Sequence, residues 1–160
     1  ATTEIYTLSL HDALPIFAKG IADGVPMGAV VAKKEIADVF KPGDHGSTFG
    51  GSCLAIAACA ATLSALVRGD YADHAAKVGA YMEAKLAKLP HVTEVRGRGL
   101  MLGCDLDDAA GDAHDIVARA LAAGAVINAT GAHTLRFLPP LVCEEADVDS
   151  LIEILSGVLG

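Results

Sequence analysis

The stretch Phe17-Ala18-Lys19-Gly20, followed closely by Gly24-Val25-Pro26-Met27-Gly28-Ala29, is the most informative part of this 160-residue chain. Small residues, glycine and proline surround Lys19, which predicts a sharp backbone bend that approaches another group closely, rather than a lysine on a helix surface. Packing against apolar neighbours such as Phe17 and Ile21 would favour the uncharged amine that attack on an aldehyde requires. A solvated lysine in a turn is the alternative.

A second glycine-rich turn follows at His45-Gly46-Ser47-Thr48-Phe49-Gly50-Gly51. The hydroxyls of Ser47 and Thr48, beside the backbone N–H groups of a glycine loop, suit the oxygens of a phosphate. A helix that begins near Ser52 would add the favourable field of its N-terminus. An ordinary loop that caps a helix is the alternative. Together with a reactive amine on Lys19, this loop suggests an aldehyde cofactor that carries a phosphate.

Arg136 is a third candidate, within Thr134-Leu135-Arg136-Phe137-Leu138-Pro139-Pro140. An arginine inside an apolar strand needs an acidic partner, because burying an unpaired guanidinium is costly. A substrate carboxylate would serve as that partner, held by two parallel hydrogen bonds from the guanidinium. A structural salt bridge to an acidic side chain of the chain itself is the alternative.

Short apolar runs alternate with longer amphipathic segments along the chain, which predicts an α/β fold. We expect strands at residues 27–32, 92–95, 100–106, 125–128 and 134–138. We expect helices at residues 34–40, 52–68, 71–89, 112–123 and 144–159. Ser52 is placed to cap the second of these helices. The first 16 residues fit this pattern poorly, and the string Thr7 to Ile16 looks like translated sequencing-adapter sequence. We therefore interpret residues 1–16 as an atypical, non-native leader, with a native edge strand as the alternative.

Composition and charge exclude several classes of function. The chain carries 12 Lys and Arg against 20 Asp and Glu, for a net charge of −8, so it lacks the basic patch of a nucleic-acid-binding protein. Its long uncharged run, Gly50 to Val67, is rich in alanine and begins with Gly-Gly, which indicates a buried helix rather than a membrane span. Apolar residues make up 52% of the chain, which suggests that some apolar surface packs on further chain or on another subunit.

The four cysteines, Cys53, Cys59, Cys104 and Cys143, are scattered. They show no C-x-x-C pair and no matching histidine spacing, so we expect no metal site. Scattered thiols in apolar surroundings are typical of packing residues in a reducing cytoplasm.

In their order and spacing, these motifs resemble the C-terminal part of class III pyridoxal-phosphate-dependent aminotransferases. The resemblance covers Ala18 to Gly160, and besides the stretches quoted above it includes Arg96-Gly97-Arg98-Gly99-Leu100-Met101-Leu102-Gly103 and Asn128-Ala129-Thr130. It implies fold type I, in which residues 17–68 would end the large cofactor-binding domain and residues 69–160 would form a small C-terminal α/β domain.

The resemblance also implies roles for single residues. Lys19 would be the catalytic lysine that forms the Schiff base with pyridoxal 5'-phosphate. Thr48 would bind the cofactor phosphate from the neighbouring subunit of a homodimer, and Ser47 beside it would contact substrate. Arg136 would meet a substrate carboxylate or hold an acidic gate residue. The implied partners are small amino acids and 2-oxo acids.

The implied reaction moves an amino group from N-acetylornithine, or a similar ω-amino donor, to 2-oxoglutarate in arginine biosynthesis. Ornithine, succinylornithine and 4-aminobutyrate are alternative donors, while a non-catalytic dimerisation remnant and an unrelated nucleotide-binding α/β module are alternative roles. Ser52-Cys53 stands where the family has Asn-Pro. The family's acid for the pyridine nitrogen lies upstream of the lysine, and Asp12 stands in a different context. We therefore expect this chain to be a fragment that is inactive alone.

Overall fold

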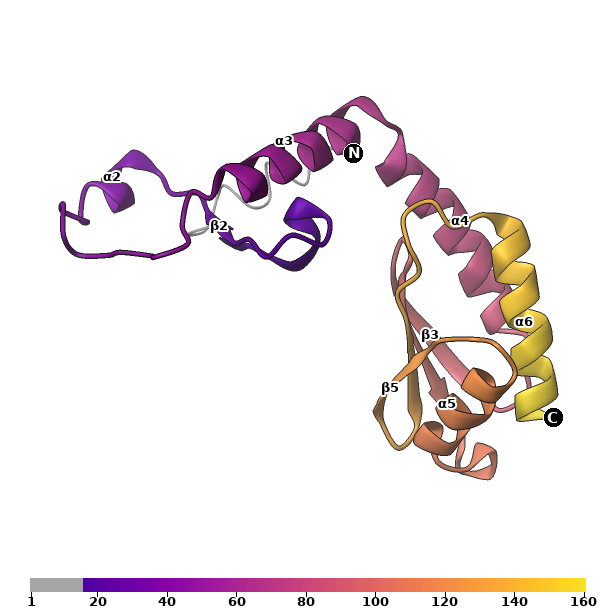
Figure 1. Ribbon diagram of the computed structural model, residues 1–160. Helices are drawn as coiled ribbons and strands as arrows, with labels where there is room; N and C mark the ends of the chain where they lie inside the picture. The colour runs from indigo at the N-terminus through magenta and orange to yellow at the C-terminus, as the bar shows by residue number, and fades with distance from the viewer. Residues whose placement is uncertain (1–15) are drawn as a thin grey trace. The chain divides into compact units, whose positions relative to one another are not determined.

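The computed structural model describes residues 16–160, and the leader predicted for residues 1–16 lies almost wholly outside this range. The chain divides into two compact units between Asp70 and Tyr71, and each unit is described by itself (Figure 1). Helices and strands alternate along the chain, which confirms the α/β fold class.

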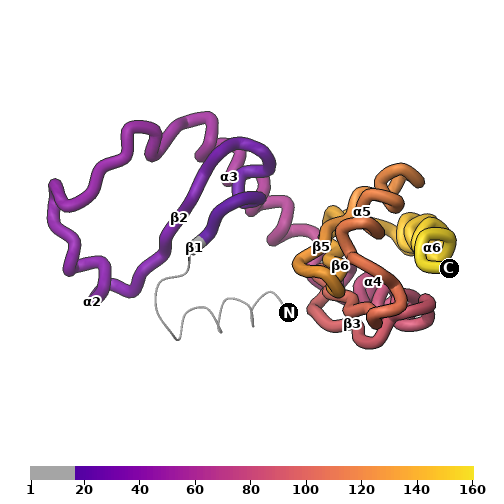
Figure 2. The backbone as a smooth tube through the Cα atoms, turned by 90° about the horizontal axis from the view of Figure 1, so that it is seen from below, coloured from indigo at the N-terminus to yellow at the C-terminus, as the bar shows by residue number. Residues whose placement is uncertain are grey.

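The first unit has little sheet. Strand β1 (Ile16–Phe17) pairs antiparallel with β2 (Ala29–Val30), and the single 3-10 turn η1 (Lys19–Ala22) lies between them. After β2 the chain makes a wide excursion that carries the short helix α2 (Lys34–Ala37), as Figure 2 shows. It then enters the long helix α3 (Cys53–Arg68).

Helix α3 is apolar on nearly all sides, because Arg68 is its only charged residue. It packs against η1, but it buries only Ala55 and Cys59. The larger apolar side chains of this helix are exposed, namely Leu54, Ile56, Leu63, Leu66 and Val67. A helix that is hydrophobic all round is typical of a protein interior, so this unit leaves uncovered a surface that its sequence makes suitable for burial.

The second unit is a four-stranded antiparallel sheet with helices packed against it. The strands are β3 (Val92–Arg98), β4 (Met101–Leu106), β5 (Asn128–Gly131) and β6 (Thr134–Phe137), in the spatial order β3-β4-β6-β5. The helices are α4 (Tyr71–Leu86), α5 (Ala113–Ala122) and α6 (Glu145–Leu159), with the short 3-10 turn η2 (Asp108–Ala110) before α5. Figure 1 shows α4 and α6 side by side along the sheet.

The core of the second unit lies between these helices and one face of the sheet. Successive residues of β4 and β6 alternate between buried and accessible positions, as expected for a sheet that is covered on one face. The largest fully buried side chains come from both layers: Val78, Met82, Leu86, Leu102, Cys104, Ile116, Leu135, Val148 and Leu155. The other face of the sheet therefore carries the polar members of each strand.

Several elements depart from the boundaries that the sequence predicts. Strand β2 is shorter than the predicted 27–32, helix α2 ends at Ala37 rather than at residue 40, and α4 ends at Leu86 rather than at residue 89. Strand β3 continues through Gly97 and Arg98, where a connecting loop was expected. The strand can do so because Gly97, at φ 150°, has no side chain, and a Cβ there would lie 2.0 Å from the carbonyl oxygen of Met101. Strand β5 begins at Asn128 rather than Ala125, because the N–H of Ala125 donates to the carbonyl of Ala120 and so ends helix α5.

Candidate functional site

Lys19 adopts an uncommon backbone conformation. Its φ is 57°, in the left-handed region that non-glycine residues rarely occupy, and it is the first residue of η1. Such strained residues cluster at functional sites, where the surrounding structure holds them in place. Asp23 and Gly24 also have positive φ, so the chain reverses within a few residues. The sharp bend predicted around Lys19 is therefore confirmed.

The burial expected for Lys19 is wrong. Its side chain is exposed, and Phe17 beside it is 39% exposed. The reason lies in η1, a single turn that packs on α3 and buries Ala22 instead. No described element of the first unit covers the lysine, so its amine is accessible to a ligand from solvent.

The loop that carries Ser47 is shaped by glycine. The N–H of Gly50 donates to the carbonyl of Ser47 over 3.3 Å, which closes a tight turn. A Cβ on Gly50 would lie 2.9 Å from the Cβ of Ser47, so a larger residue would force the turn open. Gly51 follows at φ 75°, a conformation that favours glycine.

This loop closes a cavity of about 450 Å³ in the first unit. The lining brings together the Pro26-Met27-Gly28 segment, the glycine loop and the first turn of α3, through Pro26, Met27, Gly28, Ser47, Phe49, Gly50, Gly51, Ser52, Ala55 and Ile56. Ser47 lines the cavity, whereas Thr48 is exposed and lies outside the lining. The Pro26-Met27-Gly28 motif and the glycine loop thus meet at one cavity, and Lys19 does not line it.

The N-terminus of α3 is open to an anion. Ser52 occupies the N-cap position, as the sequence predicts, but its side chain makes no capping hydrogen bond, so that part of the prediction is wrong. The first N–H groups of a helix have no partner within the helix and carry partial positive charge. At α3 they lie beside the hydroxyl-bearing loop, and this combination suits a phosphate.

Taken separately, Lys19 and the glycine loop each match one end of an aldehyde cofactor that carries a phosphate. The accessible amine of Lys19 matches the aldehyde, which needs a primary amine. The hydroxyls of Ser47 and Thr48 and the uncapped N-terminus of α3 match the phosphate. Within residues 16–160 no group of three His, Cys, Asp or Glu side chains is placed to hold a metal ion.

Arg136 lies in the second unit, on the open face of the sheet. It was expected inside an apolar strand, but β6 alternates, so Leu135 and Phe137 are buried and Arg136 is exposed. Its neighbours across the strands are Gly103 on β4 and Asn128 on β5. Among the described residues, no salt bridge to Arg136 is found. The alternative interpretation of Arg136, a structural salt bridge, is thus not seen within residues 16–160.

One row across the sheet joins three of the sequence motifs. Arg96 pairs with Gly103, Gly103 with Arg136, and Arg136 with Asn128, so these residues share the open face. Sequence reasoning singled out Arg136 as a site candidate, whereas Arg96, Gly103 and Asn128 were noted only as parts of motifs. Successive residues of a strand point to opposite faces of the sheet, so the buried apolar residues of each strand would have indicated that these residues lie on the opposite, open face.

A polar network on this face holds Asp105. The guanidinium of Arg96 donates to one carboxylate oxygen of Asp105, and the hydroxyl of Thr134 donates to the other over 2.7 Å. The hydrogen bond from Arg96 and, after it, the one from Thr134 lower the pKa of Asp105. The hydrogen bond to Asp105 raises the pKa of Arg96. The network links β3, β4 and β6 and commits Asp105 to partners other than Arg136.

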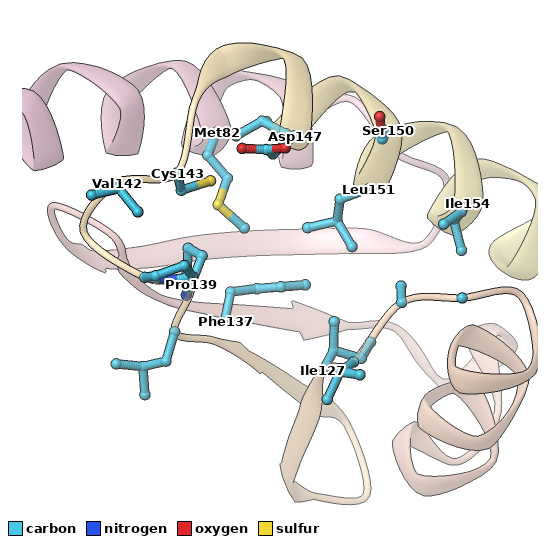
Figure 3. Close-up of a pocket in the computed structure, with 16 residues that line it drawn as sticks. Met82, Ile127, Phe137, Pro139, Val142, Cys143, Asp147, Ser150, Leu151 and Ile154 are labelled. Carbon is cyan, nitrogen blue, oxygen red and sulfur yellow. The ribbon is translucent and has the colours of Figure 1, made fainter. Parts of the chain in front are cut away.

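A larger cavity of about 510 Å³ also lies in the second unit (Figure 3). It opens between α6 and the segments before β5 and after β6, and its walls are mainly apolar, including Met82, Ile127, Phe137, Leu151 and Ile154. The carboxylate of Asp147 accepts from the N–H of Glu144, and the hydroxyl of Ser150 donates to the carbonyl of Ala146. None of the residues predicted to act in catalysis or binding lines this cavity.

Across residues 16–160, no single helix is both long and apolar enough to cross a membrane. Helices α3 and α4 reach that length and composition only when they are counted together across the break between them.

The sequence matches the family described as Aminotransferase class-III over residues 4–159. Among curated proteins, the acetylornithine aminotransferase of Caldanaerobacter subterraneus subsp. tengcongensis is 44% identical over 146 residues, covering 89% of this chain and 36% of the relative. The Bacillus subtilis acetylornithine aminotransferase is 39% identical over 145 residues, which cover 89% of this chain and 37% of the relative.

Solved structures agree with this match. The acetylornithine aminotransferase of Elizabethkingia anophelis superposes with a TM-score of 0.84 at 28% identity, covering 97% of this chain and 42% of that one. An ornithine aminotransferase of Toxoplasma gondii, with PLP at partial occupancy in its active site, superposes with a TM-score of 0.83 at 33% identity. The superposition covers 93% of this chain and 36% of that one. This chain spans little more than a third of the length of the curated relatives it matches. The family match nevertheless extends over almost all of its residues, and the chain belongs to the class III aminotransferases, which depend on pyridoxal phosphate.

Proposed function

We propose that Lys19 is the residue that holds pyridoxal phosphate, and that the chain contributes it to an aminotransferase site. One observation carries the proposal: within the matched motif, Lys19 is held in a left-handed conformation with its side chain exposed. A lysine that only faces solvent in a turn would gain nothing from this unfavourable backbone conformation. We further propose that the first unit is the end of the cofactor-binding domain and the second the small C-terminal domain.

When bound, pyridoxal phosphate supplies an electron sink that stabilises negative charge at a substrate carbon. The role we assign to Lys19 is to anchor the cofactor through Nζ and, once released by the incoming amine, to take a proton from that carbon. The same amine would then deliver this proton to the carbon of the cofactor that carried the aldehyde, so that it acts first as a base and afterwards as an acid. Ser47 and Thr48 orient the cofactor and substrate through their hydroxyls, with Thr48 serving the neighbouring subunit of a homodimer. Arg136 holds a substrate carboxylate by paired hydrogen bonds.

The proposed substrates are N-acetylornithine as donor and 2-oxoglutarate as acceptor, in arginine biosynthesis. The curated relatives, which are acetylornithine aminotransferases, support this choice of donor. Ornithine is the second candidate donor, because ornithine aminotransferases are among the solved structures that superpose on this chain. Discrimination between the two rests on whether the donor carries an acetyl group.

The proposed assembly is a homodimer in the cytoplasm. The uncovered apolar side chains of α3 support an interface there, because such a surface is costly to leave in water. All four cysteines are free thiols, which fits a reducing compartment. A dimerisation role without catalysis would use the same surface and leave Lys19 without function.

We propose that the 160-residue chain does not turn over substrate by itself, since nearly two thirds of the length of the relatives has no counterpart in it. The test is a glutamate-forming assay with pyridoxal phosphate, 2-oxoglutarate and either N-acetylornithine or ornithine. The chain and its Lys19→Ala variant should both give only background glutamate. Lys19-dependent glutamate would contradict the proposed inactivity, and if it formed faster with ornithine than with N-acetylornithine, it would overturn the proposed donor as well.

A further inference from the structure

The turn that carries Lys19 is strained at both ends. Lys19 opens η1 at φ 57°, and Asp23 follows its last residue at φ 41°. Both conformations are unfavourable for a residue with a side chain, and they persist only where neighbouring contacts hold them. The N–H of Asp23 donates to the carbonyl of Gly20 over 3.2 Å, but a single 3-10 turn has little stability of its own. Contacts outside η1 must therefore fix the position of Lys19.

Two contacts of the first unit hold this turn. Before it, the pairing of Phe17 with Ala29 fixes the base of the segment between β1 and β2. Within it, Ala22 is fully buried, whereas Lys19 and Gly20 of the same turn are exposed. Ala22 is thus the residue through which η1 packs on α3, and Figure 1 shows this turn in indigo beside the helix. Lys19 lies between the two contacts.

The face of α3 that receives Ala22 is made of small residues. Ala55 and Cys59 are the buried residues of this helix, and they lie on one face because they are four positions apart. Besides Ala22 they are the only buried residues that the structure describes in the first unit, so Ala22 packs against this pair. The half-buried Thr62 continues the face, and its hydroxyl is satisfied by the carbonyl of Ala58 over 2.9 Å. A contact between small, buried side chains leaves no room for a larger one.

Helix α3 also supports the glycine loop. Ala55 lines the cavity of the first unit together with Ser47 and Gly50 of that loop. The turn with Lys19 and the loop with Ser47 therefore rest on the same helix, and Ala55 belongs to both contacts. A shift of Ala22 across α3 would consequently move Lys19 relative to Ser47.

We propose that Ala22 is a positioning residue for Lys19, and that its contact with Ala55 and Cys59 sets where the lysine amine lies relative to the glycine loop. The inference rests on the proposed function, in which Lys19 holds pyridoxal phosphate. Ala22 takes no part in the chemistry and acts only through the backbone of η1. A larger side chain at this position lifts η1 from α3, relaxes the strained φ of Lys19 and leaves its amine no more reactive than that of any other exposed lysine.

The test is borohydride trapping of pyridoxal phosphate on the chain, measured as the ratio of pyridoxyl label on Lys19 to that on Lys33. Lys33 is an exposed lysine of the same unit, so the ratio compares two amines within one molecule. We expect Ala22→Leu to lower this ratio about tenfold, because small displacements of a reacting group have effects of at least this size. Ala60→Leu, the same substitution at an exposed position of α3 next to Cys59, is the matched control and should leave the ratio unchanged.

A second pair of variants separates positioning from loss of structure. Ala22→Cys adds one sulfur atom to the contact and should lower the ratio, and its combination with Cys59→Ala returns the total volume to that of the wild type and should restore the ratio. Hydrogen exchange of peptides from 53–68 should match the wild type in every variant, and if Ala22→Leu loses this protection, the second pair decides.

An unchanged ratio in a folded Ala22→Leu would overturn the proposal, as would a ratio that Cys59→Ala does not restore. Failure of the proposed function is a different result, since the wild-type chain would then show no preference for Lys19 over Lys33. That result would also remove the basis for a positioning role of Ala22.

Discussion

Asp105 links three strands through two side chains, so its ionisation bears directly on the second unit. Arg96 on β3 and Thr134 on β6 both donate to its carboxylate. The pKa of Asp105 is therefore lowered, and the pKa of Asp149 is lowered in the same way by Lys85 and Tyr81. A carboxyl whose pKa is depressed on folding contributes stability above its unfolded pKa, about 3.9 for aspartate, and loses it as the pH falls through the folded value.

The resulting prediction concerns acid denaturation. Between pH 7 and about pH 5 these two carboxylates should leave the urea midpoint unchanged, and below about pH 4 the midpoint should fall as they take up protons. Asp105→Asn removes one of them, so the acid limb of this variant should be less steep than that of the wild type. The measurement is urea unfolding followed by circular dichroism across this pH range. An acid limb of the same slope in both proteins would show that Asp105 does not contribute.

The cysteines differ in accessibility, which gives a second prediction for single residues. Burial raises the pKa of Cys104 to about 11, and its thiol faces the core. Cys53 is exposed at the start of α3. Since the thiolate is the reactive form, iodoacetamide at pH 8 should label Cys53 in the native chain well before Cys104. Mass spectrometry of the digested protein measures the order, and equal rates would show that Cys104 is not buried.

Contacts between elements give a prediction that opposes helix propensity. Replacing glycine with alanine inside a helix usually adds about 1 kcal/mol of stability. Gly79 of α4 is an exception, because its Cβ would lie 2.1 Å from the backbone of Gly99. Gly79→Ala should therefore destabilise the second unit, by about 1–3 kcal/mol as other overpacked sites do.

Gly157 of α6 is the matched control, since a Cβ there would meet nothing within 4 Å. Gly157→Ala should stabilise the unit by about 1 kcal/mol. Urea unfolding of both variants and of the wild type measures these changes in the free energy of unfolding. Stabilisation by Gly79→Ala would mean that α4 does not pack on the hairpin as described.

At the level of elements, the sequence predicts those parts that depend on local pattern. The alternation in 100–106 predicts β4, and the helical periodicity in 71–89 predicts α4 apart from its last three residues, because each period reflects one buried face. The passage of β3 through Gly97 could not be predicted, since it depends on how closely Met101 approaches across the hairpin. The exposure of Arg136 was missed for a simpler reason, because an apolar run was taken as buried on both faces.

Across the whole molecule, the two units bury very different amounts of apolar surface. Among the described residues the first unit buries only Ala22, Ala55 and Cys59, and all other buried apolar side chains belong to the second unit. We therefore expect hydrogen exchange to be slow in α4, β4 and α6 and fast in the 41–52 loop. Mass spectrometry of exchanging peptides checks this, and strong protection of the loop in the isolated chain would contradict it.

For the candidate site too, features set by neighbouring residues could be predicted from the sequence, and features set by contacts between distant segments could not. Lys19, Ser47 and Thr48 could be singled out as candidates because glycine and proline mark their turns within a few residues of sequence. The exposure of Lys19 could not be predicted in this way, because it depends on η1 burying Ala22 against α3, which lies more than thirty residues further along the chain.

Reductive trapping tests directly whether Lys19 holds pyridoxal phosphate. The chain is mixed with an equimolar amount of the cofactor, reduced with borohydride, digested, and searched for pyridoxyl-lysine by mass spectrometry. The account predicts that Lys19 is labelled ahead of the other exposed lysines of the first unit, Lys33, Lys34 and Lys41, and that Lys19→Arg abolishes the preferred label without increasing theirs. Labels spread evenly over these lysines, or a Lys19 that remains unmodified, would contradict it.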